Sequence, residues 1–508
     1  MLSDAVNLDY YSRTLGYKIK RGDFAITSPN LPQRITIYAE ANTANQATLD
    51  TTYKEITSTQ QAGEVYGFGS PVYQIMRILR PVNGGSSVGG IKTIVSAQES
   101  PVGATARVLE ITPTGVATKN GVHTLKIAGR SGLDGRFYNI NIEKGDDTSD
   151  ITSKIEDVIN KVLGCPVSAT STDYEAIATT KWKGLTANDV SIEIDTNDVD
   201  LGITYSVAVT ASGSGTPDIS TALSGLGNAW TTLLVNSYGT VSSVMDALEA
   251  TNGIPDDTTP TGRYAGIIMK PLIAITGSTE DDPSSITDSR KLEVTIAIAP
   301  APLSKGLPME AAANMTNIFA RLMQNTPNGT VGGKYYPDMP TPESIGSMAD
   351  YDTRNSILEK GCSTVDLVAG RYQVQDFVTT YHKDGEIPLQ FNYCRNLMID
   401  FNIRYTVYLK EVSNLLDKSI ALDSDIVTAS NVIKPKQWIQ ILNQVAEDLT
   451  ARNLIVEVEF MKDSIQVQVS DTNPNRLETF FKYKRSSVVR IGSTTVEAGF
   501  YYGTSIEI

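Results

Sequence analysis

Two glycine- and serine-rich breaks constrain the fold of this 508-residue chain more than any other feature. The stretches NGGSSVGG (83–90) and SGSGTP (212–217) are typical of flexible connections between folded parts. Between them, short segments alternate apolar and polar residues, and one amphipathic helix is expected at 151–163. At roughly 150 residues per domain, the length allows about three domains. The sequence therefore predicts a multidomain protein with an inserted β-rich part.

The flanking segments predict a mixture of strands and helices. A strand is expected at RITIYAE (34–40), and a helix begins at Pro71, where Ser70 can accept hydrogen bonds from the free amide groups. After the second break, the predicted strands are TTLLVNS (231–237), AGIIM (265–269) and LEVTIAIA (292–299), with helices at 241–250 and 308–323. The last predicted elements are helices at 392–416 and 436–452 and strands LIVEVEFM (454–461) and IQVQV (465–469). The fold class expected is α+β or α/β and multidomain.

Charge and composition exclude several functional classes. The net charge of −14 has the wrong sign for a protein that binds nucleic acid directly. Only His123 and His382 are present, which leaves little for metal binding or general-base catalysis. Cys165, Cys362 and Cys394 have neither the number nor the spacing of a disulfide framework or zinc site. No signal peptide or membrane-spanning run is recognised, so folding in a reducing cytoplasm is expected.

No motif with catalytic chemistry is found in a suitable context. A literal Gly-x-Ser-x-Gly match at 85–89 lies inside the first glycine-rich break, whereas a nucleophile elbow requires a strand before it and a helix after it. The sequence Gly332-Gly333-Lys334 lacks the upstream glycine and the following Ser or Thr of a phosphate loop. The acidic run at 195–200 does not have the spacing of a calcium loop. We therefore predict no enzymatic activity, no catalytic residue, no cofactor and no metal site.

The charges are unevenly distributed along the chain. Residues 143–200 hold 13 acidic and 5 basic side chains, which we interpret as a solvated outer face. Residues 476–490 have the opposite sign, because one acid, Glu478, accompanies five basic residues: Arg476, Lys482, Lys484, Arg485 and Arg490. This basic segment is either another solvated face or a surface that docks on an acidic partner.

The last residues, TTVEAGFYYGTSIEI (494–508), alternate like a strand but have no partner hairpin nearby. Such a terminus either hangs free or adds a strand to the sheet edge of another molecule. For a chain without catalytic residues we favour strand donation. The candidate donor residues are Val496, Phe500, Tyr501, Tyr502, Ile506 and Ile508.

Five segments, taken in order, resemble the tail sheath protein family of contractile bacteriophages, in particular its Mu-type branch. They are AGEVYGFGSPVYQIMRILR (62–80), WKGLTANDVSIEID (182–195), GSGTPDISTALSGLGNAWTTLLVNSYG (213–239), ILEKGCSTVDLVAGRYQVQDFVTTY (357–381) and DTNPNRLETFFKYKRSSVVRI (471–491). The chain departs from the family pattern at its start, 21–42, and at Val374-Gln375-Asp376, where the family has Ile-Glu-Arg.

The resemblance implies a structural subunit that forms stacked hexameric rings around a tail tube and contracts to drive the tube through the host cell envelope. The implied partners are further copies of the chain, the tail tube protein, and baseplate and tail terminator proteins, with no direct nucleic acid contact and no membrane insertion. The implied location is the virion tail, assembled in the cytoplasm of the host bacterium.

The resemblance also implies a core domain made from both ends of the chain. The expected division is an N-terminal arm (1–22), a first core part (23–87), an inserted β-rich outer domain (88–211), an α/β sheath domain (212–332), a C-terminal core part (333–491) and a C-terminal arm (492–508). We expect the five basic residues at 476–490 to face the tube, and charge reversal of Lys482 and Arg485 to impair assembly with the tube without lowering the melting temperature.

Two alternative functions remain open on sequence alone. One is a sheath-like subunit of a phage-derived contractile injection device. The other, from a different class, is a secreted β-rich surface adhesin or depolymerase, which the missing signal peptide and the two C-terminal helices oppose.

Overall fold

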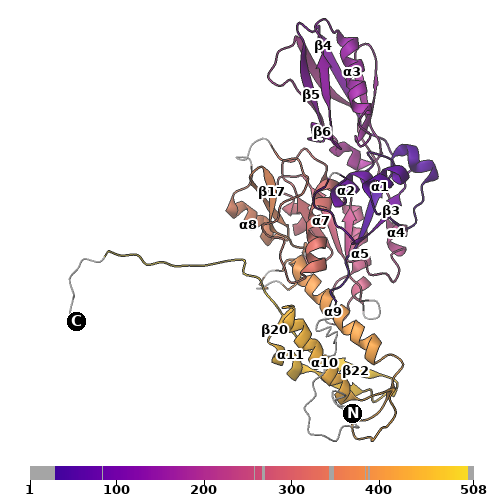
Figure 1. Ribbon diagram of the computed structural model, residues 1–508, viewed down its shortest axis with the longest axis vertical. Coiled ribbons are helices and arrows are strands. Elements are labelled where there is room, and N and C mark those ends of the chain that lie inside the picture. The colour runs from indigo at the N-terminus through magenta and orange to yellow at the C-terminus, as the bar shows by residue number, and fades with distance from the viewer. Residues whose placement is uncertain are drawn as a thin grey trace, which may run out of the picture. The chain divides into compact units, whose positions relative to one another are not determined.

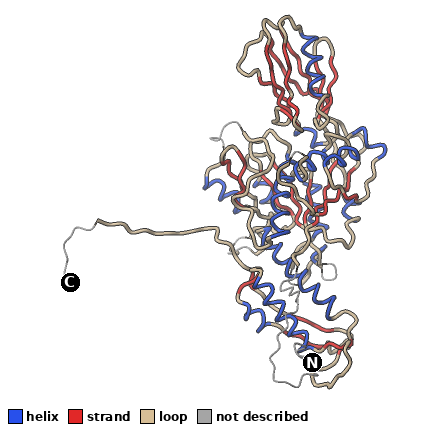
Figure 2. Tube along the Cα trace, viewed as in Figure 1, coloured by secondary structure: helices blue, strands red, loops and turns tan. Residues whose placement is uncertain are grey.

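The computed structural model describes residues 29–82, 84–256, 258–265, 269–342, 348–383, 385–386 and 390–500. The described chain divides into two compact units (Figures 1 and 2). The larger unit contains the described residues of 30–405 and 485–500, and the smaller unit contains Pro29 and residues 406–484. None of the helices in the described residues is both long and apolar enough to cross a lipid bilayer.

A six-stranded sheet forms the centre of the larger unit, in the order β15-β14-β13-β1-β3-β2. Adjacent strands of this sheet are parallel, except that the short edge strand β2 is antiparallel to β3. The strands are β1 (Arg34–Glu40), β2 (Lys54–Glu55), β3 (Lys92–Gln98), β13 (Leu233–Asn236), β14 (Ile273–Ser278) and β15 (Ile296–Pro300). Three segments predicted as separate domains, 23–87, 88–211 and 212–332, therefore contribute strands to one sheet, the middle one through β3.

Helices cover both faces of this sheet, which explains why its strands are apolar runs without polar alternation. Successive side chains of a strand point to opposite faces, so Ile35 and Ile37 enter one core cluster and Tyr38 enters the other. The first cluster includes α2 (Pro71–Leu79) and α7 (Pro308–Asn325), and the second includes α5 (Ser242–Asn252). As expected, Ser70 caps α2 by accepting from the Tyr73 amide at 3.2 Å.

After β3, two small antiparallel sheets and one α-helix make up most of the β-rich part that precedes the second glycine-rich break (Figure 1). The four-stranded sheet has the order β12-β4-β10-β9 and the three-stranded sheet has the order β11-β5-β8. Their elements are β4 (Val108–Gly115), β5 (Gly121–Ile127), β8 (Asn139–Ile142), α3 (Thr148–Asn160), β9 (Val167–Ser171), β10 (Ala176–Thr180), β11 (Ile192–Asp195) and β12 (Ile203–Ala211), with the short pair β6 (Gly132–Leu133) and β7 (Arg136–Phe137). Asp147 opens α3 in a capping box with Asp150.

The rest of the larger unit consists of short helices and a hairpin. Its elements are η1 (Thr43–Thr48), α1 (Thr59–Tyr66), η2 (Leu185–Asp189), α4 (Ser220–Ser224), η3 (Gly262–Tyr264), α6 (Ser284–Asp288), α8 (Tyr351–Glu359), β16 (Thr364–Val368) and β17 (Arg371–Asp376). Helix α9 (Cys394–Asn414) contains the boundary between the two units, after Tyr405.

The smaller unit has its own core around Trp438, which is fully buried and donates from its indole nitrogen to Thr479 at 3.1 Å. Its elements are β18 (Ser419–Ile420), β19 (Val432–Ile433), α10 (Pro435–Ala451), β20 (Ile455–Val456), α11 (Val458–Ser464), β21 (Gln466–Val469) and β22 (Leu477–Phe480). The two-residue strand β23 (Lys484–Arg485) follows at the unit boundary.

Of the predicted strands, one is wrong in part and another lies mostly outside the residues that the structure describes. The strand expected at 454–461 is wrong beyond Val456, because Glu457 has a left-handed backbone (φ 54°) that ends β20, and α11 then buries Met461. The strand expected at 265–269 lies mostly outside the described residues, which omit 266–268. The nearby buried strand that the structure does show is β14.

Candidate functional site

The five basic residues at 476–490 are divided between the two units. Arg476, Lys482 and Lys484 belong to the smaller unit, and Arg485 and Arg490 belong to the larger unit. In the smaller unit, Arg476 lies 3.1 Å from Glu478, and the Lys484 ammonium lies 2.5 Å from Glu457 and over the ring of Phe460. The Lys482 ammonium lies 5.9 Å from the centre of the Phe480 ring.

Both arginines of the larger unit are committed to carboxylates. Arg485 donates through two nitrogens to the two oxygens of Asp400, each at 2.6 Å. Arg490 pairs with Asp376, and its guanidinium lies 3.4 Å from the centre of the Tyr393 ring. Their side chains are 24% and 25% exposed.

These pairings alter the charge argument for the basic segment. Within 476–490 the only acid is Glu478, but Glu457, Asp376 and Asp400 reach the same side chains from other parts of the chain. A window of sequence cannot reveal carboxylates that the fold brings in from elsewhere. Four of the five cations are thereby locally balanced, and the orientation of this segment toward a tube stays a prediction.

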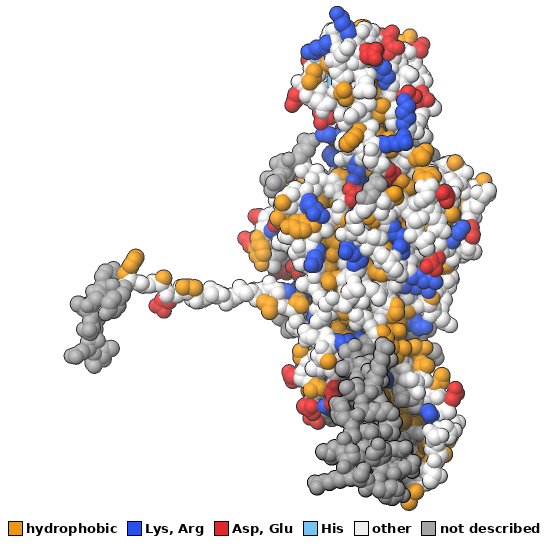
Figure 3. All heavy atoms as spheres, viewed as in Figure 1, with side chains coloured by type: hydrophobic (Ala, Val, Ile, Leu, Met, Phe, Trp, Pro, Cys, Tyr) orange, Lys and Arg blue, Asp and Glu red, His pale blue; other side chains and the backbone are white. Residues whose placement is uncertain are grey.

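The described part of the C-terminal arm is extended and exposed. Residues 491–500 contain no strand, and each is exposed. Val496 is 79% exposed and Phe500 is 88% exposed, and Figure 3 shows apolar side chains along this stretch. The other candidate strand donors, Tyr501, Tyr502, Ile506 and Ile508, lie outside the described residues.

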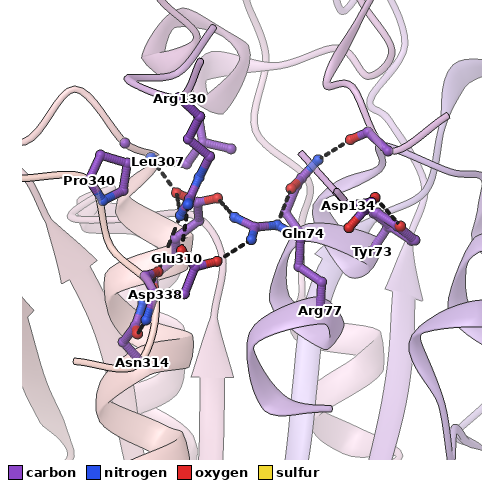
Figure 4. Close-up of polar contacts among 12 residues, drawn as sticks. Tyr73, Gln74, Arg77, Arg130, Asp134, Leu307, Glu310, Asn314, Asp338 and Pro340 are labelled. Atoms are coloured by element: carbon purple, nitrogen blue, oxygen red, sulfur yellow. Dashed lines mark hydrogen bonds and ion pairs between the residues drawn. The ribbon is translucent and has the colours of Figure 1, made fainter. Parts of the chain in front are cut away.

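A group of four charged side chains, which we call the polar junction, joins the β-rich part to the α/β part (Figure 4). It consists of Arg77 on α2, Arg130 after β5, Glu310 in the first turn of α7 and Asp338 in the loop after α7. Arg77 pairs with Glu310 and Asp338, and Arg130 reaches the same two carboxylates at 3.2 and 2.5 Å. The two cations and two anions therefore neutralise each other.

Burial makes this junction electrostatically strong. The side chain of Glu310 is 1% exposed and that of Arg77 is 7% exposed. Burial alone would raise the pKa of Asp338, but the charges of Arg77 and Arg130 outweigh it and lower this pKa to about 2. Asn314 fixes the loop by donating to the Asp338 carbonyl and accepting from its amide, both at 2.8 Å.

Sequence reasoning missed the polar junction because its members are separated by 28 to 261 positions. One signal was present: Arg77 is a charged residue within the apolar helix that begins at Pro71. A long cation in a buried helix needs a buried acid as partner.

A second buried acid lies where the central sheet meets the β-rich part. Glu40, the last residue of β1, is 1% exposed and accepts a hydrogen bond from Ser100 at 3.0 Å. Burial raises the pKa of its carboxyl to about 8, and the hydrogen bond from Ser100 opposes this only in part. Glu40 is therefore mostly protonated at neutral pH.

Comparison with known proteins shows the class to which this chain is similar: the sheath proteins of contractile phage tails, which confirms the resemblance predicted from its sequence. One relative is the Mu-like prophage FluMu tail sheath protein of Haemophilus influenzae, 23% identical over 431 residues, which cover 83% of this chain and 84% of the relative. No family model matches the chain.

Two solved structures align with nearly the whole chain at 10% sequence identity. The crystal structure of a sheath tail protein from Desulfitobacterium hafniense has a TM-score of 0.44, with 93% of this chain and 100% of that chain covered. The contracted baseplate of the anti-feeding prophage has a chain with a TM-score of 0.46, with 96% and 99% covered.

Proposed function

We propose that this chain is the structural subunit of a contractile tail sheath. The observation that carries the proposal is the similarity to the FluMu tail sheath protein, which extends over more than four fifths of both chains. A shared domain would leave most of one chain unmatched. The similarity therefore concerns the whole subunit.

In this proposal the subunits form hexameric rings that stack around a tail tube, and the C-terminal arm links them by adding a strand to a sheet of a neighbouring copy. Support comes from residues 491–499, which are exposed and belong to no strand of the described chain, so that they can pair with the sheet edge of another chain. The tail tube protein, the baseplate and the tail terminator are the further partners, and the virion tail, assembled in the host cytoplasm, is the location.

Contraction, as proposed, takes its free energy from better packing between subunits and uses no nucleotide. A packed lattice with two arrangements can switch cooperatively, so each subunit needs to contribute only a small difference between the two states. The proposal assigns no catalytic residue, cofactor or metal to the chain, and its result is movement of the tube through the host envelope.

Electron microscopy and sedimentation of the purified full-length chain test this proposal. We expect hollow tubes built of stacked rings, formed in a concentration-dependent way. Monomers or trimers at every salt and protein concentration would contradict it and would favour a surface adhesin.

A further inference from the structure

Three arginines gather at the root of the C-terminal arm, where the chain leaves the larger unit. We propose that Arg395, Arg485 and Arg490 form a clamp that fixes this root and so sets the position from which the arm reaches a second copy of the chain. The role of the clamp in assembly rests on the proposed function, whereas the contacts that form it all lie within one subunit.

The innermost contact holds the backbone of the chain. Arg395, in the first turn of α9, donates to the carbonyl of Ser486 at 2.8 Å and to its hydroxyl at 3.0 Å. Ser486 is 3% exposed, and Arg395 also donates to the carbonyl of Asn328 at 2.9 Å. Arg395 therefore connects Ser486 both to α9 and to the segment that contains Asn328.

Charged pairs lie on either side of Ser486. Before it, Arg485 forms a bidentate ion pair with Asp400 of α9, and two parallel hydrogen bonds make such an arginine–carboxylate contact strong and directional. After it, Arg490 pairs with Asp376 at the end of β17 and stacks on Tyr393. Three anchors within six residues fix the chain up to residue 490.

Beyond the last anchor the environment changes abruptly. Ile491 is 85% exposed and the following described residues are also exposed. The clamp therefore separates an anchored root from the exposed residues 491–500. Ordering the root before assembly lowers the conformational entropy lost when the arm binds, so it favours capture by a neighbouring copy.

This arrangement gives Arg485 and Arg490 a role different from facing a tube. Their donor groups are directed at Asp400 and Asp376 within the same unit. A side chain already paired in this way has less to gain from an acidic partner protein. They act as positioning residues for the arm.

The test uses the full-length chain with a nitroxide spin label on Ser493→Cys, three residues beyond the clamp. The native cysteines are buried, so the label attaches at this site. Arg490→Glu places two carboxylates together and should make the label clearly more mobile in the monomer. It should also raise the concentration needed for assembly about tenfold, equivalent to about 1.4 kcal/mol.

A charge swap separates the clamp from general destabilisation. The double variant Asp376→Arg with Arg490→Glu should return both the label mobility and the assembly concentration to within about twofold of the unsubstituted chain. Arg476→Glu, which reverses an exposed cation of the smaller unit, is the matched control and should leave the label unchanged. If Arg490→Glu fails to fold, Arg490→Gln removes the pair without adding repulsion.

Unchanged label mobility in both Arg490 variants would overturn the clamp, as would a double variant as mobile as the single one. If the unsubstituted chain does not assemble but the label responds as expected, the clamp stands and the proposed sheath function fails.

Discussion

The guanidinium group of Arg130 lies 2.5 Å from the carboxylate of Asp338, and this contact ties the β-rich part to the loop that follows α7. Arg77 holds the same carboxylate from α2. Two cations from different parts of the larger unit thus converge on one acid, with Glu310 completing the group. The β-rich part is consequently attached by buried, directional contacts as well as by its two chain connections.

Removal of Arg130 should therefore destabilise the larger unit. Arg130→Ala leaves Glu310 and Asp338 with one cation between them, and loss of one partner from a buried ion pair costs about 3 kcal/mol. Lys161→Ala is the control, because the pair of Lys161 with Asp157 is 66% exposed on both sides and its loss should cost less than about 0.5 kcal/mol. Urea unfolding of both variants checks this, and equal losses would contradict a special role for the junction.

The buried carboxyl of Glu40 should make stability depend on pH in the direction opposite to that of a salt-bridged acid. Because its pKa is raised to about 8, the folded state binds this proton more tightly than the unfolded state. The contribution of Glu40 to stability is thus fully present below about pH 4.5 and is lost as the pH rises toward 8.

Glu40→Gln keeps an acceptor for Ser100 and removes the titration, so it should raise stability at pH 8 by up to about 4 kcal/mol and have little effect at pH 4.5. Glu64→Gln, at an exposed position of α1, is the control and should change neither. Thermal unfolding at the two pH values measures the effect. A Glu40→Gln variant that is equally destabilised at both would refute the assignment.

Deletion of Val496–Ile508 should leave a folded subunit that cannot polymerise. The described residues from 491 to 500 are exposed, so their removal takes no core contact from the larger unit. Circular dichroism and the melting temperature should match the full chain, while sedimentation should show no polymer. Normal tubes from the truncated chain would remove the strand-donor role.

Charge reversal at Lys482 tests whether the smaller unit faces an acidic tube. Lys482→Glu breaks no ion pair seen in the described residues, so assembly with a tube protein should weaken while the melting temperature stays the same. Arg485→Glu, in contrast, should lower the melting temperature because it breaks the pair with Asp400. Unchanged co-assembly of the Lys482 variant would reject the tube-facing prediction.

Local structure could be predicted from the sequence wherever one pattern dominates. The strand at 34–40 occurs with the predicted bounds, and Ser70 caps its helix as expected. Where a short apolar pattern fits more than one structure, the prediction failed: 458–464 is a helix after a left-handed Glu457. Strand β14 was overlooked because its six residues follow another apolar run closely.

The charged contacts could not be predicted, since they depend on tertiary structure. Arg490 is balanced by Asp376, which precedes it by 114 positions, and Arg77 meets Glu310 across 233 positions. The sequence showed the basic residues and the strand-like C-terminal segment, and the structure shows that two of those residues, Arg485 and Arg490, pair with carboxylates just before that segment. The arm of the strand-donor prediction therefore begins at a defined place on the larger unit.

A helical reconstruction of the assembled full-length chain by cryo-electron microscopy tests the central claim most directly. The account predicts rings of six subunits around a central channel, with residues 494–508 of each copy ordered as a strand in the sheet of a neighbour. A chain that never forms rings, or a polymer in which each arm folds back on its own subunit, would contradict it.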